Sequence, residues 1–294
     1  MRTEQRTAGS AKRSRTPAGC ARMGAPSAWD CSECRCGTIT RVPCETAGAQ
    51  EEEVMWMLSF ACLIIGLCIG CRDASSRSGQ DAVKAARQRM LDVHLRGRGI
   101  TDERVLQAMA SVPREEFVPP YLRSEAYADR PLPIGLDQTI SQPYIVAYMT
   151  QAVDPKPTDR ALEIGTGSGY QAAVLSLLAD TVYTVEILDE LTLQATGTLK
   201  RLGYDKVVTA TRDGYEGWPE HAPFDIIIVT AAPDHVPQPL VEQLAPGGRL
   251  IIPVGDLWQE LRLITRREDG TLATERRLDV RFVPMTGKAQ ELPH

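Results

Sequence analysis

A glycine-rich segment, Glu163-Ile164-Gly165-Thr166-Gly167-Ser168-Gly169, lies between an apolar run and a helical pattern. Glycines at such a junction let the backbone turn tightly and approach a ligand closely at the carboxyl edge of a parallel sheet. The spacing is GxGxG, whereas a dinucleotide fingerprint would need a further glycine where Tyr170 stands. The segment therefore favours a ligand that contains a nucleoside but no pyrophosphate, such as S-adenosylmethionine. The alternative interpretation is that the glycines only form a tight turn and bind no ligand.

Two acidic residues follow this loop at distances that suit a nucleoside. Glu186 ends the next apolar run, 21 residues after Gly165, where a carboxylate can accept hydrogen bonds from two ribose hydroxyls. Asp213, followed by Gly214, comes after the third run and offers a carboxylate suited to an adenine amino group. Each is weak evidence alone, but their coincidence with the glycine loop favours a cofactor site over solvated strand ends.

A polar segment upstream contains Gln138, Thr139, Ile140 and Ser141, directly before a helix predicted at about residues 143–152. Residue type leaves two interpretations of Ser141 open. Serine is a common helix cap, and capping is the more frequent use of such a residue. The other interpretation is a hydroxyl that contacts a substrate.

The elements that position these residues alternate between strands and helices after Asp159. Strands are expected at 161–164, 181–187, 207–211, 224–230 and 249–254, and helices at 168–178, 189–202 and 236–244. This alternation predicts an α/β fold, a Rossmann-like doubly wound sheet that is mostly parallel. Residues 260–267 and 274–282 flank the turn Glu268-Asp269-Gly270, which predicts antiparallel strands at one edge.

The segment before the alternating region has a different pattern. Helical spacing begins near Val83, and Thr101 is the expected N-cap of a second helix. Five prolines within residues 113–135 predict an irregular connection, the kind of segment on which ligands are often bound.

Composition excludes several kinds of chemistry. All eight cysteines lie in the first 71 residues, so the remaining 223 can use no disulfide, cysteine nucleophile or thiolate-bound metal. Residues 72–294 carry 25 Lys and Arg against 31 Asp and Glu, a net charge of −6 that argues against a nucleic-acid partner. The cysteines at positions 31–44 lack two Cys-x2-Cys pairs, and no metal site is predicted.

The chain before the alternating region divides into segments of different character. Residues 1–53 are expected to be disordered or an untranslated extension, with Met55 or Met57 as the true start. Residues 54–71 form a hydrophobic signal or anchor segment, 72–79 a linker, and 80–294 the functional domain. A signal peptide, a lipoprotein signal ending at Cys71 and a membrane tether remain open. The basic residues after the run favour a cytoplasmic domain over an exported one.

Five segments together resemble the protein-L-isoaspartate O-methyltransferase family of class I methyltransferases: residues 134–143, 163–169, 213–219, 246–255 and 281–284. The resemblance covers about residues 80–287 in unbroken order. It implies methyl transfer from S-adenosylmethionine to the α-carboxylate of L-isoaspartyl and D-aspartyl residues in damaged proteins and peptides. It further implies that Ser141 is the active-site serine. The implied cofactor-binding positions are Gln138, Thr139, Ile140, Ser141, Glu163, Gly165, Thr166, Gly167, Ser168, Gly169, Glu186, Asp213, Gly214 and Thr286.

The chemistry of this reaction agrees with the residues available. A carboxylate is ionised at pH 7 and can attack a sulfonium methyl without a general base, so positioning is the main requirement. His221 and His235 are expected to be solvated in loops near the carboxyl edge, with His235 the better candidate for lining the site. The alternatives are a class I methyltransferase for a small molecule and a non-catalytic, membrane-tethered binding module.

Overall fold

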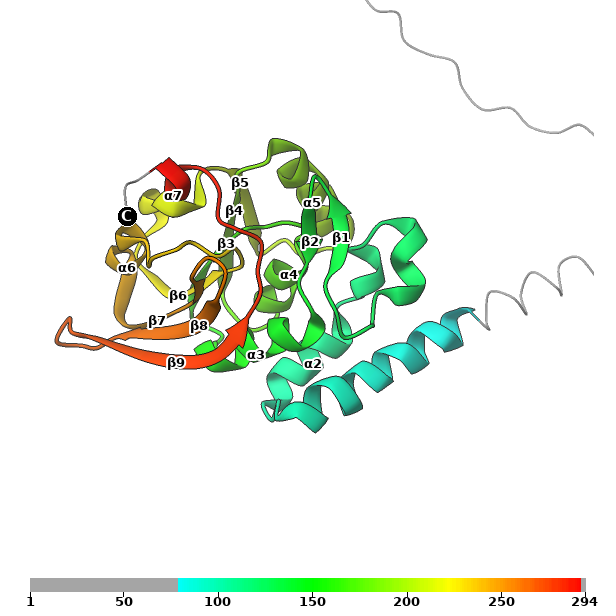
Figure 1. Ribbon diagram of the computed structural model, residues 1–294. Coiled ribbons are helices and arrows are strands. Elements are labelled where there is room, and N and C mark those ends of the chain that lie inside the picture. The colour runs from blue at the N-terminus through cyan, green and yellow to red at the C-terminus, as the bar shows by residue number, and fades with distance from the viewer. Residues whose placement is uncertain (1–78, 292–294) are drawn as a thin grey trace, which may run out of the picture. The chain divides into compact units, whose positions relative to one another are not determined.

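The computed structural model describes residues 79–291 (Figure 1), which belong to the unit Ile64–His294. The predictions for residues 1–53, for 54–71 and for most of the linker fall outside the described residues. Within residues 79–291, no helix combines the length and the apolar character needed to cross a membrane.

A seven-stranded sheet forms the centre of the described part, with strand order β5-β4-β3-β6-β7-β8-β9. Its strands are β3 (Arg160–Ile164), β4 (Thr181–Glu186), β5 (Val207–Thr211), β6 (Phe224–Val229), β7 (Leu244–Val254), β8 (Gln259–Arg266) and β9 (Leu272–Val280). The first five pair in parallel, whereas β7–β8 and β8–β9 are antiparallel. The predicted fold class, with antiparallel strands at one edge, is confirmed.

Burial of the strands follows their place in the sheet. In central strand β6, the residues from Ile226 to Val229 are all fully buried, because helices cover both faces of a parallel sheet. Edge strand β9 is mostly exposed along its length. The continuous apolar run of β6 and the polar pattern of β9 therefore distinguish centre from edge.

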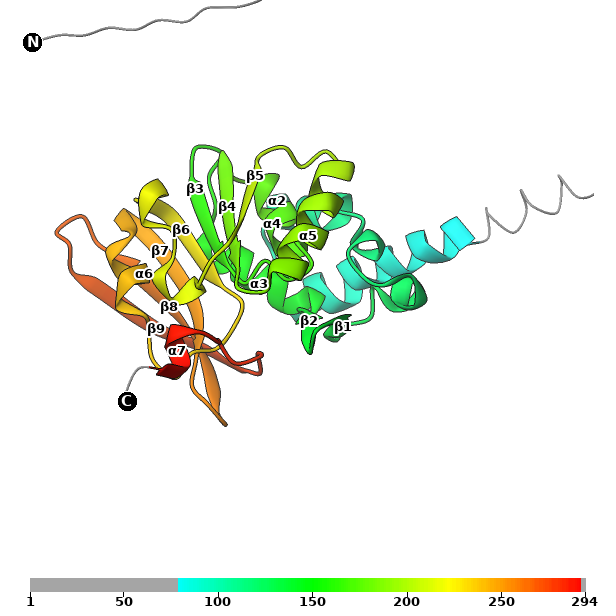
Figure 2. The ribbon, with the colours of Figure 1, turned by 90° about the horizontal axis from the view of Figure 1, so that it is seen from above.

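Helices cover both faces of the sheet (Figure 2). The helices α3 (Pro143–Val153), α4 (Tyr170–Ser176) and α5 (Asp189–Arg201) lie on one face, and α6 (Gln238–Glu242) lies on the other. Two helices are shorter than predicted. Gly169 has a φ of 86°, so α4 begins only at Tyr170. Helix α6 ends early because strand β7 starts at Leu244.

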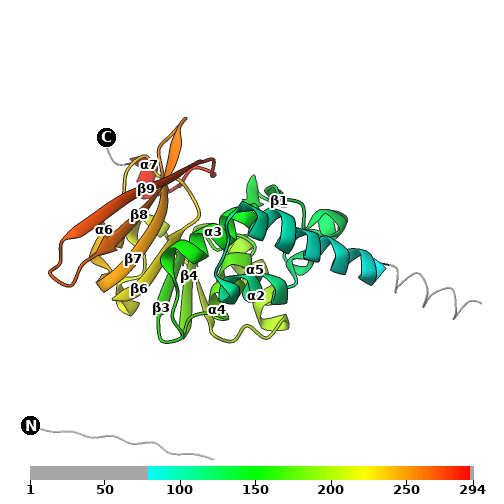
Figure 3. The same ribbon diagram turned by 90° about the horizontal axis from the view of Figure 1, so that it is seen from below.

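The amino-terminal helices pack beside this layer (Figure 3). Residues 79–89 are helical and continue through a π-helical turn, η1 (Met90–Leu95), and a 3₁₀ turn, η2 (Arg96–Arg98). Helix α2 (Glu103–Ser111) follows. Buried side chains of η1 and α2 join those of α3 and α4 in one hydrophobic cluster.

The N-cap of α2 is one residue later than predicted. The Asp102 carboxylate accepts a hydrogen bond from the Arg104 N–H at 2.9 Å, which is the capping interaction. The Thr101 N–H instead donates to Gln151 Oε1 at 2.8 Å. Thr101 as the cap is therefore wrong: both adjacent residues have side chains that can cap a helix, and the Asp102 carboxylate makes the bond, while Gln151 Oε1 accepts from the N–H groups of both residues.

The proline-rich connection is more ordered than predicted. It contains the 3₁₀ turns η3 (Arg114–Glu116) and η4 (Pro120–Glu125). It ends in a hairpin, in which β1 (Leu132–Gly135) pairs with β2 (Gln138–Ile140). The two hairpin turn residues, Leu136 and Asp137, have φ values of 51° and 57°. The sequence pattern did not reveal this hairpin, because neither turn residue is glycine.

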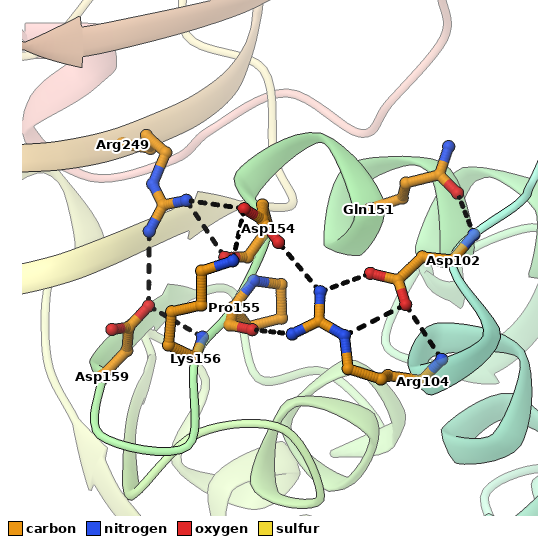
Figure 4. Close-up of polar contacts among 8 residues, drawn as sticks. All are labelled: Asp102, Arg104, Gln151, Asp154, Pro155, Lys156, Asp159 and Arg249. Carbon is orange, nitrogen blue, oxygen red and sulfur yellow. Dashed lines mark hydrogen bonds and ion pairs between the residues drawn. The ribbon is translucent and has the colours of Figure 1, made fainter.

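A polar network joins α2 and α3 to the amino ends of the strands (Figure 4). The Arg104 guanidinium donates to Asp154 Oδ1 and to the Pro155 carbonyl, both at 2.8 Å. The Arg249 guanidinium donates to the Asp154 carbonyl at 3.0 Å and to Asp159 Oδ2 at 3.3 Å. Because Arg249 lies on β7 and Asp159 precedes β3, the network holds the edge of the sheet opposite the glycine loop.

Candidate active site

The glycine loop lies at a topological switch point of the sheet. Strand β3 has β4 on one side and β6 on the other, because the chain crosses back over β3 after β5. The loop follows the carboxyl end of β3, which is where ligands bind in open α/β sheets. Its first glycine is sterically required, since a Cβ on Gly165 would lie 2.4 Å from Thr230 Oγ1, and its φ is +93°.

Glu186 binds the glycine loop directly. Its Oε2 accepts a hydrogen bond from the Gly167 N–H at 2.9 Å. Its Oε1 accepts from the N–H groups of Ile187 at 2.9 Å and Leu188 at 3.1 Å. Carboxylate oxygens have further lone pairs, so these bonds fix the side chain and leave acceptor capacity for a ligand.

Glu163 lies beneath the loop in a fully buried position. Its Oε2 accepts a hydrogen bond from Thr184 Oγ1 at 2.7 Å, and Thr184 Oγ1 lies 2.7 Å from Thr166 Oγ1. Its Oε1 is buried without a hydrogen-bond partner among the residues from 79 to 291. Burial raises the pKa of Glu163 to about 8, because a charged carboxylate is costly away from water.

This raised pKa predicts a pH-dependent effect of Glu163→Gln. In the unfolded chain Glu163 ionises near its ordinary pKa of 4.5, whereas in the fold it stays protonated up to about pH 8. Wild-type stability therefore falls between these pH values, by at most about 1.4 kcal/mol per pH unit, and the loss levels off above pH 8. Glutamine cannot ionise, so the variant should gain stability relative to the wild type as pH rises through this window.

Denaturant unfolding of both proteins at pH 5, 6.5, 8 and 9 measures this difference. The exposed Glu242→Gln variant controls for the loss of one carboxyl group. A difference between Glu163→Gln and wild type that stays constant over the pH series would contradict the buried, protonated carboxyl.

Asp213 connects two segments that are far apart in the chain. Its Oδ1 accepts from the Tyr215 N–H at 3.0 Å, which caps the 3₁₀ turn η5 (Gly214–Glu216). Its Oδ2 accepts from the Lys288 N–H at 2.8 Å, at the start of α7 (Lys288–Glu291). Thr286, two residues before Lys288, thereby lies in the segment that contacts Asp213.

Ser141 does not cap the helix that follows it. Helix α3 begins at Pro143, its N-cap is Gln142, and no side chain makes the capping bond. The capping interpretation is therefore wrong. The Ser141 carbonyl accepts a hydrogen bond from Arg114 Nη2 at 2.8 Å, and Ser141 is half-buried beside a groove.

This groove is open and has a volume of about 1490 Å³. Most of its lining comes from the segment 139–145, the loop after β6, the β7–β8 turn with the start of β8, and β9 with the residues after it, and Arg98 and Pro131 complete it. In the described part of the chain, Thr139 and Ser141 line it, whereas Glu186 and Asp213 do not. Thr230 joins the two regions, because it lines the groove and its Oγ1 donates to the Gly165 carbonyl at 2.8 Å.

The β1–β2 hairpin lies next to the glycine loop. A Cβ on Gly167 would come within 3.5 Å of Ile134 Cδ1, and φ at Gly167 is +52°. Ile140, at the end of the hairpin, is buried, while Thr139 is exposed. The structure thus brings the residues 138–141 to the same side of the sheet as the residues 165–169.

The two loop histidines are not simply solvated. His235 Nε2 is hydrogen-bonded to Tyr215 OH at 2.9 Å, and His235 Nδ1 lies 2.5 Å from Asp234 Oδ1. Because Asp234 lines the groove, this arrangement adjoins the candidate site. His221 stacks on Tyr183 with ring centres 4.3 Å apart, and it precedes β6, so its expected place at the carboxyl edge is wrong.

The comparisons with known proteins agree with this geometry. The family model described as Protein-L-isoaspartate(D-aspartate) O-methyltransferase matches residues 85–290. A Protein-L-isoaspartate O-methyltransferase of Gloeobacter violaceus is 55% identical over 198 residues, covering 67% of this chain and 97% of that protein. The chain belongs to this family. The Protein-L-isoaspartate O-methyltransferase 1 of Cupriavidus necator is 58% identical, over 65% of this chain and 75% of its own length.

Solved structures show the same relationship to the protein-L-isoaspartate O-methyltransferase family. One protein-L-isoaspartate O-methyltransferase superposes with a TM-score of 0.64 at 33% identity, covering 69% of this chain and 67% of its own. A putative protein-L-isoaspartate O-methyltransferase from Plasmodium falciparum, solved with S-adenosyl-L-homocysteine, gives a TM-score of 0.58 at 29% identity, over 67% and 96% of the two chains. The family resemblance seen in the sequence is confirmed.

Proposed function

We propose that this protein transfers a methyl group from S-adenosylmethionine to the α-carboxylate of L-isoaspartyl and D-aspartyl residues in damaged proteins and peptides. The observation that carries the proposal is the position of Ser141. It lies in a wide groove that meets the glycine loop at Thr230, within the span that matches the family model. The groove exceeds the usual 300–1,000 Å³ of small-molecule sites, which favours a polypeptide over a small substrate.

The cofactor site fits a nucleoside without a pyrophosphate. Gly165 and Gly167 have left-handed φ values and leave the loop backbone open to close approach. Glu186 is held at the loop with spare lone pairs for ribose hydroxyls, and Asp213 lies at the next loop position for the adenine amino group. S-adenosylmethionine, when bound, supplies the methyl group.

The residues of the chain then have three tasks. Ser141 donates a hydrogen bond to the substrate carboxylate and fixes its direction of approach. The groove excludes water from one side of that carboxylate, which is already ionised at neutral pH and needs no general base. Correct alignment of two bound reactants supplies an effective molarity on the order of 10⁵ M or more, so positioning alone can account for most of the rate.

The decisive experiment offers the full chain two peptides that differ only in having L-isoaspartate or normal L-aspartate at one position. With labelled S-adenosylmethionine, we expect a base-labile methyl ester on the isoaspartyl peptide only. Equal labelling of both peptides would contradict the specificity. Labelling of neither would contradict the proposed function and would leave the non-catalytic binding module.

We propose that this activity is cytoplasmic, and the alternative is a protein that is membrane-anchored or exported through residues 54–71. Five basic residues follow the hydrophobic run within residues 72–89, which favours a cytoplasmic domain, and S-adenosylmethionine is made there. Mass spectrometry of the membrane fraction tests this location. Acylation at Cys71 would identify a lipoprotein signal and place the domain outside the cytoplasm.

A further inference from the structure

Arg114 is a fully buried arginine that lies between the two halves of the candidate active site. Its guanidinium donates from Nε to the Ala126 carbonyl at 2.7 Å and from Nη2 to the Ser141 carbonyl at 2.8 Å. Its central carbon lies 4.7 Å from the centre of the Tyr170 ring. Tyr170 is the first residue of α4, directly after the glycine loop. One side chain thus contacts both the segment that contains Ser141 and the first residue of α4, which follows the glycine loop.

A buried guanidinium is costly to maintain. Burial disfavours its charged form and lowers the pKa of Arg114, and its Nη1 is buried without a hydrogen-bond partner among residues 79–291. Removing the guanidinium alone would leave the Ala126 and Ser141 carbonyls without this donor, which costs stability as well as position. A test of its role must therefore separate the placing of other groups from a general loss of stability.

The backbone at Ser141 depends on the hydrogen bond from Arg114, because Ser141 lies outside any helix or strand. The first helical bonds of α3, from Ile145 and Val146, go to the Gln142 carbonyl. The Ser141 carbonyl instead faces a charged donor, and bonds to charged donors are about twice as strong as neutral ones. The guanidinium is rigid and planar, so fixing it on Ala126 and Tyr170 also fixes the carbonyl of Ser141.

We propose that Arg114 is a positioning residue for methyl transfer, which holds the Ser141 hydroxyl in register with the cofactor loop. This inference rests on the proposed function. It predicts that losing the guanidinium lowers the rate of transfer and leaves cofactor affinity nearly unchanged, because the glycine loop, Glu186 and Asp213 keep their own contacts.

The test compares Arg114→Met and Arg114→Lys with Arg249→Met. Arg249 is a matched control because its guanidinium also donates to a backbone carbonyl in the partly buried network of Figure 4, at the opposite edge of the sheet. With an isoaspartyl peptide, Arg114→Met should lower kcat at least about tenfold, since small misplacements of reacting groups are costly. Arg114→Lys should lose less, and Arg249→Met should stay within about twofold of wild type. The Kd for S-adenosylhomocysteine should change by less than about threefold in all three.

A double-mutant cycle separates positioning from general destabilisation. In a Ser141→Ala background, Arg114→Met should lower kcat by less than about twofold, because the hydroxyl that it places is already gone. The same fold-reduction in both backgrounds would overturn the proposal. If Arg114→Met does not fold, Arg114→Lys carries the same cycle.

Hydrogen exchange gives a readout that does not need activity. Amides in the segment 141–146 should exchange faster in the Arg114 variants than in the wild type or Arg249→Met. Unchanged exchange would overturn the role of Arg114 whatever the enzyme does. An inactive wild type with faster exchange in the Arg114 variants would instead contradict the proposed function and leave the structural contact established.

Discussion

Ser141→Ala is expected to lower the single-turnover rate of methyl transfer by about a hundredfold while the protein remains folded. The hydroxyl orients the substrate carboxylate in our proposal, and misplacing a reacting group by about 1 Å can cost this much. Loss of a helix cap would instead cost about 1 kcal/mol of stability and leave turnover of the folded enzyme intact. Since Gln142 is the N-cap of α3 and no side chain makes the capping bond, we expect almost no change in stability.

Melting temperature and single-turnover rate should be measured on the same preparation of Ser141→Ala. Ser111→Ala is a suitable control, because Ser111 is an exposed serine of α2 whose hydroxyl donates to the Gln107 carbonyl away from the groove. A lowered melting point with a near-wild-type rate would make Ser141 a structural residue. If Ser141→Ala lowers the rate no more than Ser111→Ala does, the proposed role of Ser141 in methyl transfer is likewise contradicted.

The parts of the site that the sequence predicted are those encoded locally. The glycine loop is recognisable because tight turns after a buried strand need glycine, and Gly165 indeed has no room for a Cβ. Glu186 is recognisable because parallel strands place their carboxyl ends at one edge. The strand alternation was likewise predictable, since each strand is a short apolar run between turn residues.

The remaining features depend on contacts between distant segments. Nothing in the sequence around Arg114 marks it as buried, because its surroundings come from Ala126, Ser141 and Tyr170. The same is true of Thr230, whose importance lies in its bonds to the Ile164 and Gly165 carbonyls. Single-sequence patterns report the periodicity of one segment, whereas these residues act across three or four segments.

Glu186→Gln is expected to weaken binding of S-adenosylmethionine by roughly 1.5–3 kcal/mol, or at least about tenfold in Kd. Three backbone N–H groups donate to the two carboxylate oxygens of Glu186 in the structure. A glutamine amide has only one acceptor oxygen. Its NH₂ group must face either Gly167 or the pair Ile187 and Leu188, so part of this arrangement is lost in either orientation.

Calorimetry with S-adenosylmethionine and its 2′-deoxy analogue distinguishes two roles of Glu186. If the carboxylate accepts from the ribose hydroxyls, the wild type should bind the 2′-deoxy analogue at least about tenfold more weakly, and Glu186→Gln should discriminate much less. If Glu186 only holds the glycine loop, the variant would weaken both ligands equally and the wild type would bind them alike. Glu190→Gln, on the exposed side of α5, is the control for removing one negative charge from the same region. Because Glu186 contacts Gly167 directly, we expect the loss of its carboxylate to affect the glycine loop as well. The comparison of S-adenosylmethionine with its 2′-deoxy analogue, rather than the affinity for one ligand alone, therefore decides whether Glu186 contacts the ribose.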